Sequence, residues 1–339
     1  MRAGTRNLIT DISGLRVGNA SDEDLKSGTT VLTCERPMTA AVHVMGGAPG
    51  TRETDLLSPE NTVEVVDALV LSGGSAFGLD AVGGVQSGLR EAGRGFAVGD
   101  QHIPIVPGAI LFDLINGGNK DWGLHSPYRD LGYAAFQSAA CDFELGSIGA
   151  GTGALIAGLK GGLGSASCEM SDGTKVGALV AVNALGAATI ADGPEFWASP
   201  FEIGTEFGGL GAPSATPEDA DDIRIKFRHA QNPGQNTTIG IIATNAKLTK
   251  AQAKRLAVVA HDGFARAIWP SHTPLDGDLI FSVATGELER EPTMDQWIDL
   301  SAVAASTMAR AIARGTYHAT PQENDLMPCW QQKFGASTS

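Results

Sequence analysis

Apolar and polar residues follow one another along this chain in a pattern that predicts a layered α/β protein. Four short apolar runs, rich in β-branched residues or alanine, are predicted as buried strands: 40–45, 176–188, 239–243 and 279–283. Three longer segments are predicted as helices: 76–92, 249–268 and 300–314. After residue 237 the order is therefore strand, helix, strand, helix, which suits a sheet with helices packed on it.

Local signals place several element boundaries. Thr249 and Gln252 match a capping box, which predicts a helix start, and Gly315 is predicted to end the last helix. Ser58-Pro59-Glu60 has a cap, a proline and a first-turn acid, so a further helix is predicted to begin there. The following apolar run, 63–71, can continue that helix or form a strand.

Two segments carry no clear periodicity. Residues 190–235 are mostly irregular, with several Gly and Pro residues and an acidic patch, and we interpret them as a surface excursion leading to Asn236. The tail after Glu323 is polar and is predicted to be disordered.

Composition fits a globular enzyme. The chain has 339 residues, of which 42% are hydrophobic and 18% charged, and its length allows a large core. Glycine is abundant, at 44 residues, but it shows no Gly-X-Y period. The glycines lie in turns between apolar runs, as close backbone approaches would require.

Charge and cysteine usage exclude several classes. The net charge of −14 argues against a nucleic-acid partner. The first residues contain no apolar signal segment and no run reaches membrane-spanning length, so we expect a cytoplasmic protein without membrane association. The cysteines are scattered, at positions 34, 141, 168 and 329, and we expect reduced, mostly buried thiols. Neither they nor the seven histidines show metal-ligand spacing, so no metal is expected.

Three known motifs are incomplete here. Residues 149–154 satisfy G-x-G-x-x-A, but the preceding residues 141–144 make a poor buried strand, which argues against a dinucleotide site. The Gly74-Ser75 pair fails the nucleophile-elbow pattern because Phe77 occupies the last position. The glycine run around Lys160 lacks the spacing of a phosphate-binding loop, so no organic cofactor is expected.

The dipeptide Asn236-Thr237 carries the most informative candidate chemistry. A polar turn delivers Thr237 to the start of a β-branched segment that continues into the apolar run 239–243. If the Asn236–Thr237 bond were cut, one residue would carry both a hydroxyl nucleophile and a free α-amine that acts as its base. Such an amine titrates at about 7.7–8.0, close to neutral. The alternative is an ordinary loop that enters a buried strand.

Three further sites are candidates with equally plain alternatives. Asp276 and Asp278 flank a glycine before the run 279–283 and can orient a hydroxyl and an amine, although on the pattern alone an Asp-Gly turn is the better interpretation. Lys160 lies in a glycine run with room for a ligand, or is a surface lysine. Asn183 interrupts an apolar run and is either an oxyanion donor or a structural hydrogen-bonding residue.

Together these segments resemble the self-processing amidohydrolases that include the L-aminopeptidase/D-amidase-esterases, the β-peptidyl aminopeptidases and the nylon-oligomer endohydrolases. The resemblance covers nearly the whole chain. Its carriers are the segments 46–57, 71–80, 105–109, 149–154, 158–164 and 236–240.

The resemblance implies one domain, 1–339, with a four-layer αββα sandwich similar to N-terminal-nucleophile hydrolases but with distinct connectivity. It implies self-cleavage at Asn236–Thr237 into fragments 1–236 and 237–339, with Thr237 as the nucleophile. Lys160, Asn183, Asp276 and Asp278 would be its active-site partners. It also implies a homo-oligomer, such as a tetramer of processed heterodimers, that needs no metal or organic cofactor.

The Asn-Thr pair and the two aspartates look more like the nylon-oligomer branch, in which threonine is the nucleophile. That branch implies hydrolysis of linear amides such as 6-aminohexanoate oligomers. The alternatives are an aminopeptidase acting on short peptides with an N-terminal β- or α-residue, an acyltransferase related to ornithine acetyltransferase, whose Ala-Thr-Met-Leu motif is absent, and a non-enzymatic binding protein, whose chain would stay uncut.

Overall fold

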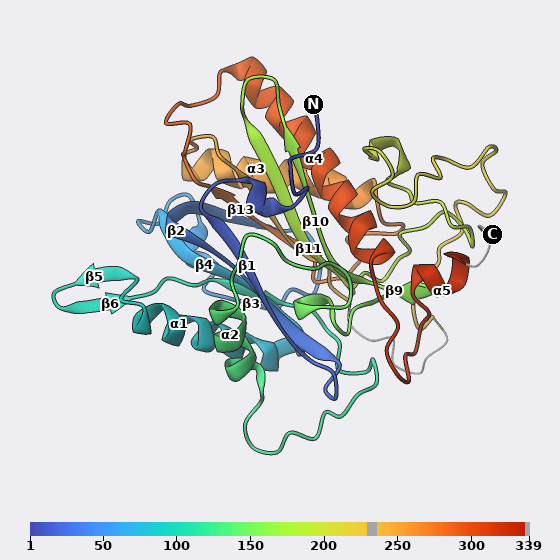
Figure 1. Ribbon diagram of the computed structural model, residues 1–339, viewed down its shortest axis with the longest axis horizontal. Coiled ribbons are helices and arrows are strands. Elements are labelled where there is room, and N and C mark those ends of the chain that lie inside the picture. Colours follow the sequence, from blue (N-terminus) through green and yellow to red (C-terminus); the bar gives the residue numbers. More distant parts are fainter. Residues whose placement is uncertain (229–235, 336–339) are drawn as a thin grey trace.

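A computed structural model describes residues 1–228 and 236–335 of the chain. Nine strands form one hydrogen-bonded sheet that folds over on itself into two layers (Figure 1). The first layer contains, in order, β10 (Gly162–Glu169), β11 (Lys175–Val182), β12 (Ile239–Thr244) and β13 (Leu279–Ala284). The second contains β1 (Leu15–Asp22), β4 (Val65–Ser72), β7 (Gly108–Ile110) and β3 (Thr51–Arg52).

The long strand β2 (Ser27–Val44) joins the two layers. Its first half pairs with β1 and β4, whereas its last residues, 39–44, pair with β13. The pairing of β2 with β4 is interrupted between Thr33 and Met38, and this stretch contains Pro37, which has no N–H to give to a neighbouring strand. The interruption lets one strand belong to both layers.

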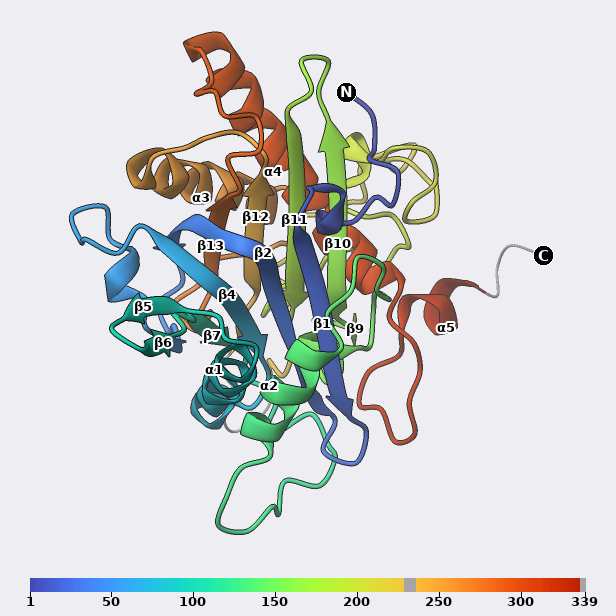
Figure 2. The ribbon, with the colours of Figure 1, turned by 60° about the vertical axis from the view of Figure 1, so that its left-hand side comes forward.

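Among the described residues, five α-helices accompany the sheet. They are α1 (Ala81–Glu91), α2 (Tyr128–Gln137), α3 (Lys250–Ala265), α4 (Met294–Tyr317) and the short α5 (Trp330–Phe334). Helices α3 and α4 cover the β10–β13 layer, and α1 and α2 cover the β1–β2–β4 layer (Figure 2). Two small hairpins form separate two-stranded sheets: β5 (Phe96–Val98) pairs with β6 (Gln101–Ile103), and β8 (Leu155–Ile156) pairs with β9 (Leu159–Lys160).

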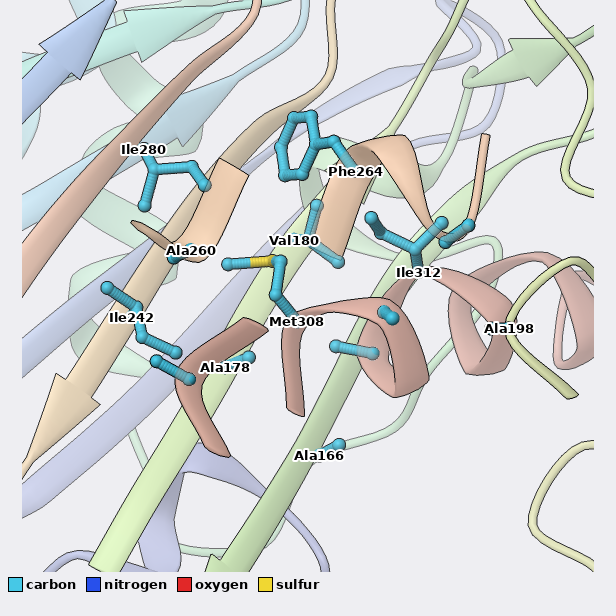
Figure 3. Close-up of a cluster of buried hydrophobic side chains, with 14 of the residues drawn as sticks. Ala166, Ala178, Val180, Ala198, Ile242, Ala260, Phe264, Ile280, Met308 and Ile312 are labelled. Carbon is cyan, nitrogen blue, oxygen red and sulfur yellow. The ribbon is translucent and has the colours of Figure 1, made fainter. Parts of the chain in front are cut away.

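Three apolar cores separate the four layers. One lies between the two sheet layers and includes Ile241 and Phe281 from one face and Leu32 and Leu69 from the other. A second lies between β10–β13 and helices α3 and α4, where Met308 packs among strand and helix side chains (Figure 3). A third lies beneath α1 and α2. This is the expected αββα sandwich.

The central strands and helices confirm the sequence-based predictions. The runs 239–243 and 279–283 are β12 and β13, the run 63–71 forms most of strand β4, and the capping box at Thr249 opens α3. The predicted strand 40–45 is the end of the longer β2, and the segment 76–92 contains a 3-10 turn (Ser75–Asp80) followed by α1. Cys34, Cys168 and Cys329 are buried free thiols, and Cys141 is half-buried.

Other boundaries were wrong. No helix begins at Ser58, because the chain makes only turns there before β4. The predicted strand 176–188 ends at Val182, so Asn183 follows the strand. Gly315 lies inside α4, which continues to Tyr317, because the helix packs its glycine face closely on β10. Strands β1 and β10 had no clear sequence signal.

The segment predicted as a surface excursion and the tail predicted to be disordered both contribute buried residues. In the irregular segment after Ile190, Phe196, Phe207 and Lys226 are buried, although residues 229–235 lie outside the described ranges. The polar tail carries α5, whose Trp330 stacks on Phe196. Within the described ranges, every helix is too short or too polar to cross a bilayer.

Candidate active site

Thr237 lies two residues before β12, which is flanked by β11 and β13. Its side chain is buried, and its hydroxyl donates to the carbonyl oxygen of Asn236 over 2.6 Å. The backbone N–H of Gly277 donates to the same oxygen over 2.8 Å. The carbonyl of the Asn236–Thr237 peptide bond therefore faces the Thr237 hydroxyl and already accepts one backbone hydrogen bond.

The backbone around this peptide bond is held on both sides. The Thr237 N–H donates to the Asn183 carbonyl, at 3.1 Å, directly after the end of β11. The Asn236 N–H donates to the Leu275 carbonyl, also at 3.1 Å, in the loop before β13. Parallel pairing of β12 with β13 begins just beyond this point. The Asn236–Thr237 bond is thus clamped between two neighbouring chain segments.

Asp276 and Asp278 hold the same loop through backbone N–H groups. The Asp276 carboxylate accepts from Thr273 and Leu185, at 2.8 and 3.2 Å. Asp278 accepts from Thr238 at 2.8 Å and also binds His272. Burial, and secondly the neighbouring Asp278, raise the pKa of Asp276. In the uncut chain both carboxylates position the backbone around Thr237.

Gly277 has a steric role as well as a hydrogen-bonding one. A Cβ at this position would lie 2.5 Å from the Ala48 carbonyl oxygen and 2.7 Å from the Thr237 hydroxyl oxygen. Only glycine lets the loop approach the nucleophile this closely. The Asp-Gly-Asp sequence was the signal for this, although it was interpreted through its two acids alone.

Asn183 forms hydrogen bonds through both the oxygen and the nitrogen of its side-chain amide. Its side-chain oxygen accepts from the N–H of Leu155 at 3.0 Å and from the ammonium of Lys226 at 2.8 Å, and its amide nitrogen donates to the Phe112 carbonyl at 2.9 Å. Its backbone carbonyl binds Thr237, as described above. The structure therefore places Asn183 in contact with Thr237 through its backbone.

Lys160 has different neighbours. Its buried ammonium donates to Asp325 at 2.8 Å and to Gln322 at 3.3 Å. Lys26 also donates to Asp325, at 3.0 Å, so one carboxylate links two lysines. Burial lowers the pKa of Lys160, and Asp325 opposes that shift. Lys160 reaches the site indirectly, because in the β8–β9 hairpin it pairs with Leu155, which contacts Asn183.

Two neighbours of the site were missed from the sequence. The Nδ1 atom of His272 is hydrogen-bonded to a carboxylate oxygen of Asp278 over 2.9 Å, and the His272 ring stacks on Phe264. Lys226 lies in the segment interpreted as a surface excursion, but its ammonium is buried beside Asn183. The only signal for Lys226 was a lysine between the apolar residues Ile225 and Phe227, which is too common a pattern to select it.

The fold is an αββα sandwich, and a buried threonine lies just before a central strand and faces the carbonyl of the residue that precedes it. This combination defines a self-processing hydrolase of amide bonds with a variant N-terminal-nucleophile fold. The chain belongs to peptidase family S58, whose family model matches residues 7–325.

Relatives in the family carry two kinds of name. Uncharacterized aminopeptidases of Mycobacterium tuberculosis and Mycobacterium bovis are each 42% identical over 333 residues, covering 93% of this chain and 95% of theirs. A 6-aminohexanoate-oligomer endohydrolase of a Kocuria species is 27% identical over 301 residues, covering 86% of this chain and 78% of its own.

Solved structures agree with the fold. A β-aminopeptidase of a Burkholderia species matches with a TM-score of 0.67 at 21% identity, covering 98% of this chain and 94% of that one. The L-aminopeptidase D-Ala-esterase/amidase of Ochrobactrum anthropi, described as a new variant of the N-terminal-nucleophile hydrolase fold, matches with a TM-score of 0.66 at 19% identity, covering 98% and 95%.

Proposed function

We propose that this protein is an aminopeptidase that cuts itself between Asn236 and Thr237 and then uses Thr237 as an N-terminal nucleophile. One observation carries the proposal: the Thr237 hydroxyl and the Gly277 N–H converge on the Asn236 carbonyl oxygen, at 2.6 and 2.8 Å. The first is the attacking group, and the second can stabilise the negative charge that attack would place on that oxygen.

Self-cleavage then needs only groups of the chain and one water. The Thr237 hydroxyl oxygen bonds to the Asn236 carbonyl carbon, the peptide C–N bond breaks, and the hydroxyl proton passes to the departing nitrogen. This moves the acyl group to the hydroxyl and leaves a free α-amine on Thr237. Water hydrolyses the ester, which gives the fragments 1–236 and 237–339.

In the mature enzyme, the α-amine of Thr237 takes the hydroxyl proton as the hydroxyl attacks a substrate amide. The resulting ammonium gives that proton to the leaving amine, and water releases the acyl group. We assign the oxyanion contact to the Gly277 N–H, because it already donates to the Asn236 carbonyl oxygen, whereas the Asn183 amide nitrogen donates to Phe112. We assign the base to the α-amine, because the Lys160 ammonium pairs with Asp325.

The aminopeptidase assignment replaces the nylon-oligomer assignment as the leading one. The 42% identical relatives are named aminopeptidases, and the relatives named 6-aminohexanoate-oligomer endohydrolases are 27% identical. The threonine nucleophile and the aspartate pair keep hydrolysis of linear oligoamides as the second candidate.

Cleavage is tested by the denatured intact mass of the purified protein with N-terminal sequencing of any small fragment. We expect two fragments, the smaller beginning Thr-Thr-Ile-Gly, in place of one 35.0 kDa chain. Thr237→Ala should give one uncut, inactive chain, and Thr237→Ser should keep partial cleavage and activity. A cut and active Thr237→Ala protein would remove the nucleophile from this account.

Substrate class is tested on the processed enzyme with matched amides. An aminopeptidase should hydrolyse an amino-acid p-nitroanilide with a free amine and reject its N-acetylated form. An endohydrolase should cleave an N-blocked 6-aminohexanoate oligomer. Transfer of the acyl group to an added amine, in place of water, would identify an acyltransferase.

A further inference from the structure

A second lysine, Lys226, has its ammonium buried beside the nucleophile. It donates to three oxygens: the Leu155 carbonyl at 2.6 Å, the Asn183 side-chain oxygen at 2.8 Å and the Asn183 carbonyl at 3.2 Å. Three acceptors match the three N–H donors of an ammonium. The geometry therefore favours the charged form in this position, and its cost of burial is offset by full hydrogen bonding.

Lys226 and Thr237 share one acceptor. The Asn183 carbonyl accepts from the Thr237 nitrogen at 3.1 Å and from Lys226 at 3.2 Å. After cleavage, that Thr237 nitrogen is the α-amine. The Lys226 amine, which is positively charged below about pH 7, would then lie across a single oxygen atom from the group that must accept a proton.

The charges around this amine act in opposite directions. Lys226 disfavours a second positive charge, whereas Asp276 and Asp278 favour it from the loop before β13. His272 is bound to Asp278. The carboxylates of Asp276 and Asp113 attract the Lys226 ammonium and favour its charged form. Burial lowers the pKa of Lys226 to about 7, and these two acids oppose the shift.

We propose that Lys226 is a positioning residue that keeps the α-amine of Thr237 in its neutral, proton-accepting form near neutral pH. The proposal rests on the proposed self-cleavage, since only cleavage creates that amine. An ordinary α-amine titrates at about 7.7–8.0 and is mostly protonated at pH 7. Lowering its pKa by one unit raises the neutral fraction at pH 7 several-fold, with a corresponding gain in kcat/KM.

The test compares the pH profiles of kcat/KM for the processed wild type and Lys226→Met. Methionine keeps the unbranched shape of the side chain, one atom shorter, and removes its charge. We expect the acid limb of Lys226→Met to move up by about one pH unit, with a several-fold lower kcat/KM at pH 7 that recovers at pH 9. Lys226→Arg, which keeps the charge, should leave the limb closer to that of the wild type.

Lys250 supplies a matched control. It is also a buried lysine that donates to three oxygens, the carbonyls of Leu56, Ser58 and Asn61 at 3.1, 2.7 and 2.9 Å, but these lie in the loop before β4. Lys250→Met should lower stability and leave the acid limb in place. An unmoved limb in Lys226→Met, or an equal movement in Lys250→Met, overturns the proposal.

A direct titration of the wild type covers the case in which Lys226→Met does not fold. The rate at which acetic anhydride acetylates the Thr237 α-amine, followed by peptide mapping across pH, reports its pKa. We expect a value below 7.7, and a value of 8 or higher overturns the proposal. A wild-type chain that stays uncut instead defeats the proposed function, so the two failures are distinguishable.

Discussion

At the scale of single residues, the carbonyl oxygen of Asn236 is the centre of the site. It accepts from the side chain of Thr237, two residues before β12, and from a backbone N–H of the loop before β13. Gly277 gives that N–H, and its missing side chain leaves the space that Thr237 occupies.

Gly277→Ala should therefore slow self-cleavage by at least about tenfold, since oxyanion donors of this kind are typically worth 10²–10³ in rate. The added methyl would collide with the Ala48 carbonyl and the Thr237 hydroxyl and push the donor away. The fraction of cut chain against time on a denaturing gel measures the effect. Leu275→Ala, in the same half-exposed loop, keeps the backbone and should cleave at close to the wild-type rate; unchanged cleavage in Gly277→Ala would remove its assigned role.

His261 predicts a pH dependence of stability. Burial, and secondly His272, lower its pKa from 6.5 to about 3 in the folded chain. Below pH 6.5 the His261 side chain is protonated in the unfolded chain but stays neutral in the folded chain. The free energy of unfolding therefore falls as the pH falls from 6.5 towards 3. The contribution is about 2 kcal/mol between pH 6.5 and 5.

Urea unfolding of the uncut Thr237→Ala chain at pH 7 and pH 5 measures this effect. The added variant His261→Gln should reduce the loss of stability on acidification, and the exposed control His125→Gln should leave it unchanged. An identical pH dependence with and without His261 would contradict the assignment.

At the scale of elements, α4 and β10 pack through glycine. A Cβ on Gly315 would lie 2.9 Å from the Gly164 nitrogen and 3.0 Å from the Gly162 carbonyl oxygen. Helix propensity alone predicts that Gly315→Ala stabilises α4 by about 1 kcal/mol. Packing predicts the opposite sign, because both contacts are with backbone atoms of a buried strand.

We expect Gly315→Ala to lower the free energy of unfolding by about 1–3 kcal/mol. Gly83→Ala in α1, where the added methyl is 3.8 Å from its nearest neighbour, should be neutral or stabilising by up to about 1 kcal/mol. Both values come from urea unfolding of the uncut chain. A stabilised Gly315→Ala protein would show that the helix can shift away from β10.

At the scale of the whole molecule, the proposed cut separates neighbours within one sheet. Strands β12 and β13 belong to the small fragment, but they lie between β11 and β2 of the large one. Asp325 and Lys250 of the small fragment also bind Lys160 and the loop 56–61 of the large one. The two fragments should therefore remain one folded unit.

Size-exclusion chromatography with light scattering tests this expectation. The cut wild type and the uncut Thr237→Ala chain should have the same native mass, and only denaturant should separate the fragments. Loss of the small fragment under native conditions would contradict it. The same measurement reports the homo-oligomer, which stays a prediction.

The sequence by itself determined a layered α/β class, the strands β12 and β13, the helix α3 and the candidate nucleophile Thr237, whereas the four-layer αββα arrangement was implied by the family resemblance. These follow from local signals, since apolar runs, a capping box and a hydroxyl residue before a strand are adjacent in the chain. It also selected Asp276, Asp278 and Asn183, through polar residues beside apolar runs.

Only the tertiary structure decided which groups meet Thr237. Gly277 lies against Thr237 because β13 pairs with β12, His272 joins the site by binding Asp278, and Lys226 joins it because an irregular segment folds inward against Asn183. It likewise placed Lys160 with Asp325 and continued α4 through Gly315. These contacts join residues that are distant in sequence. Such contacts produce no periodic pattern in the amino-acid sequence, so the sequence alone could not predict them.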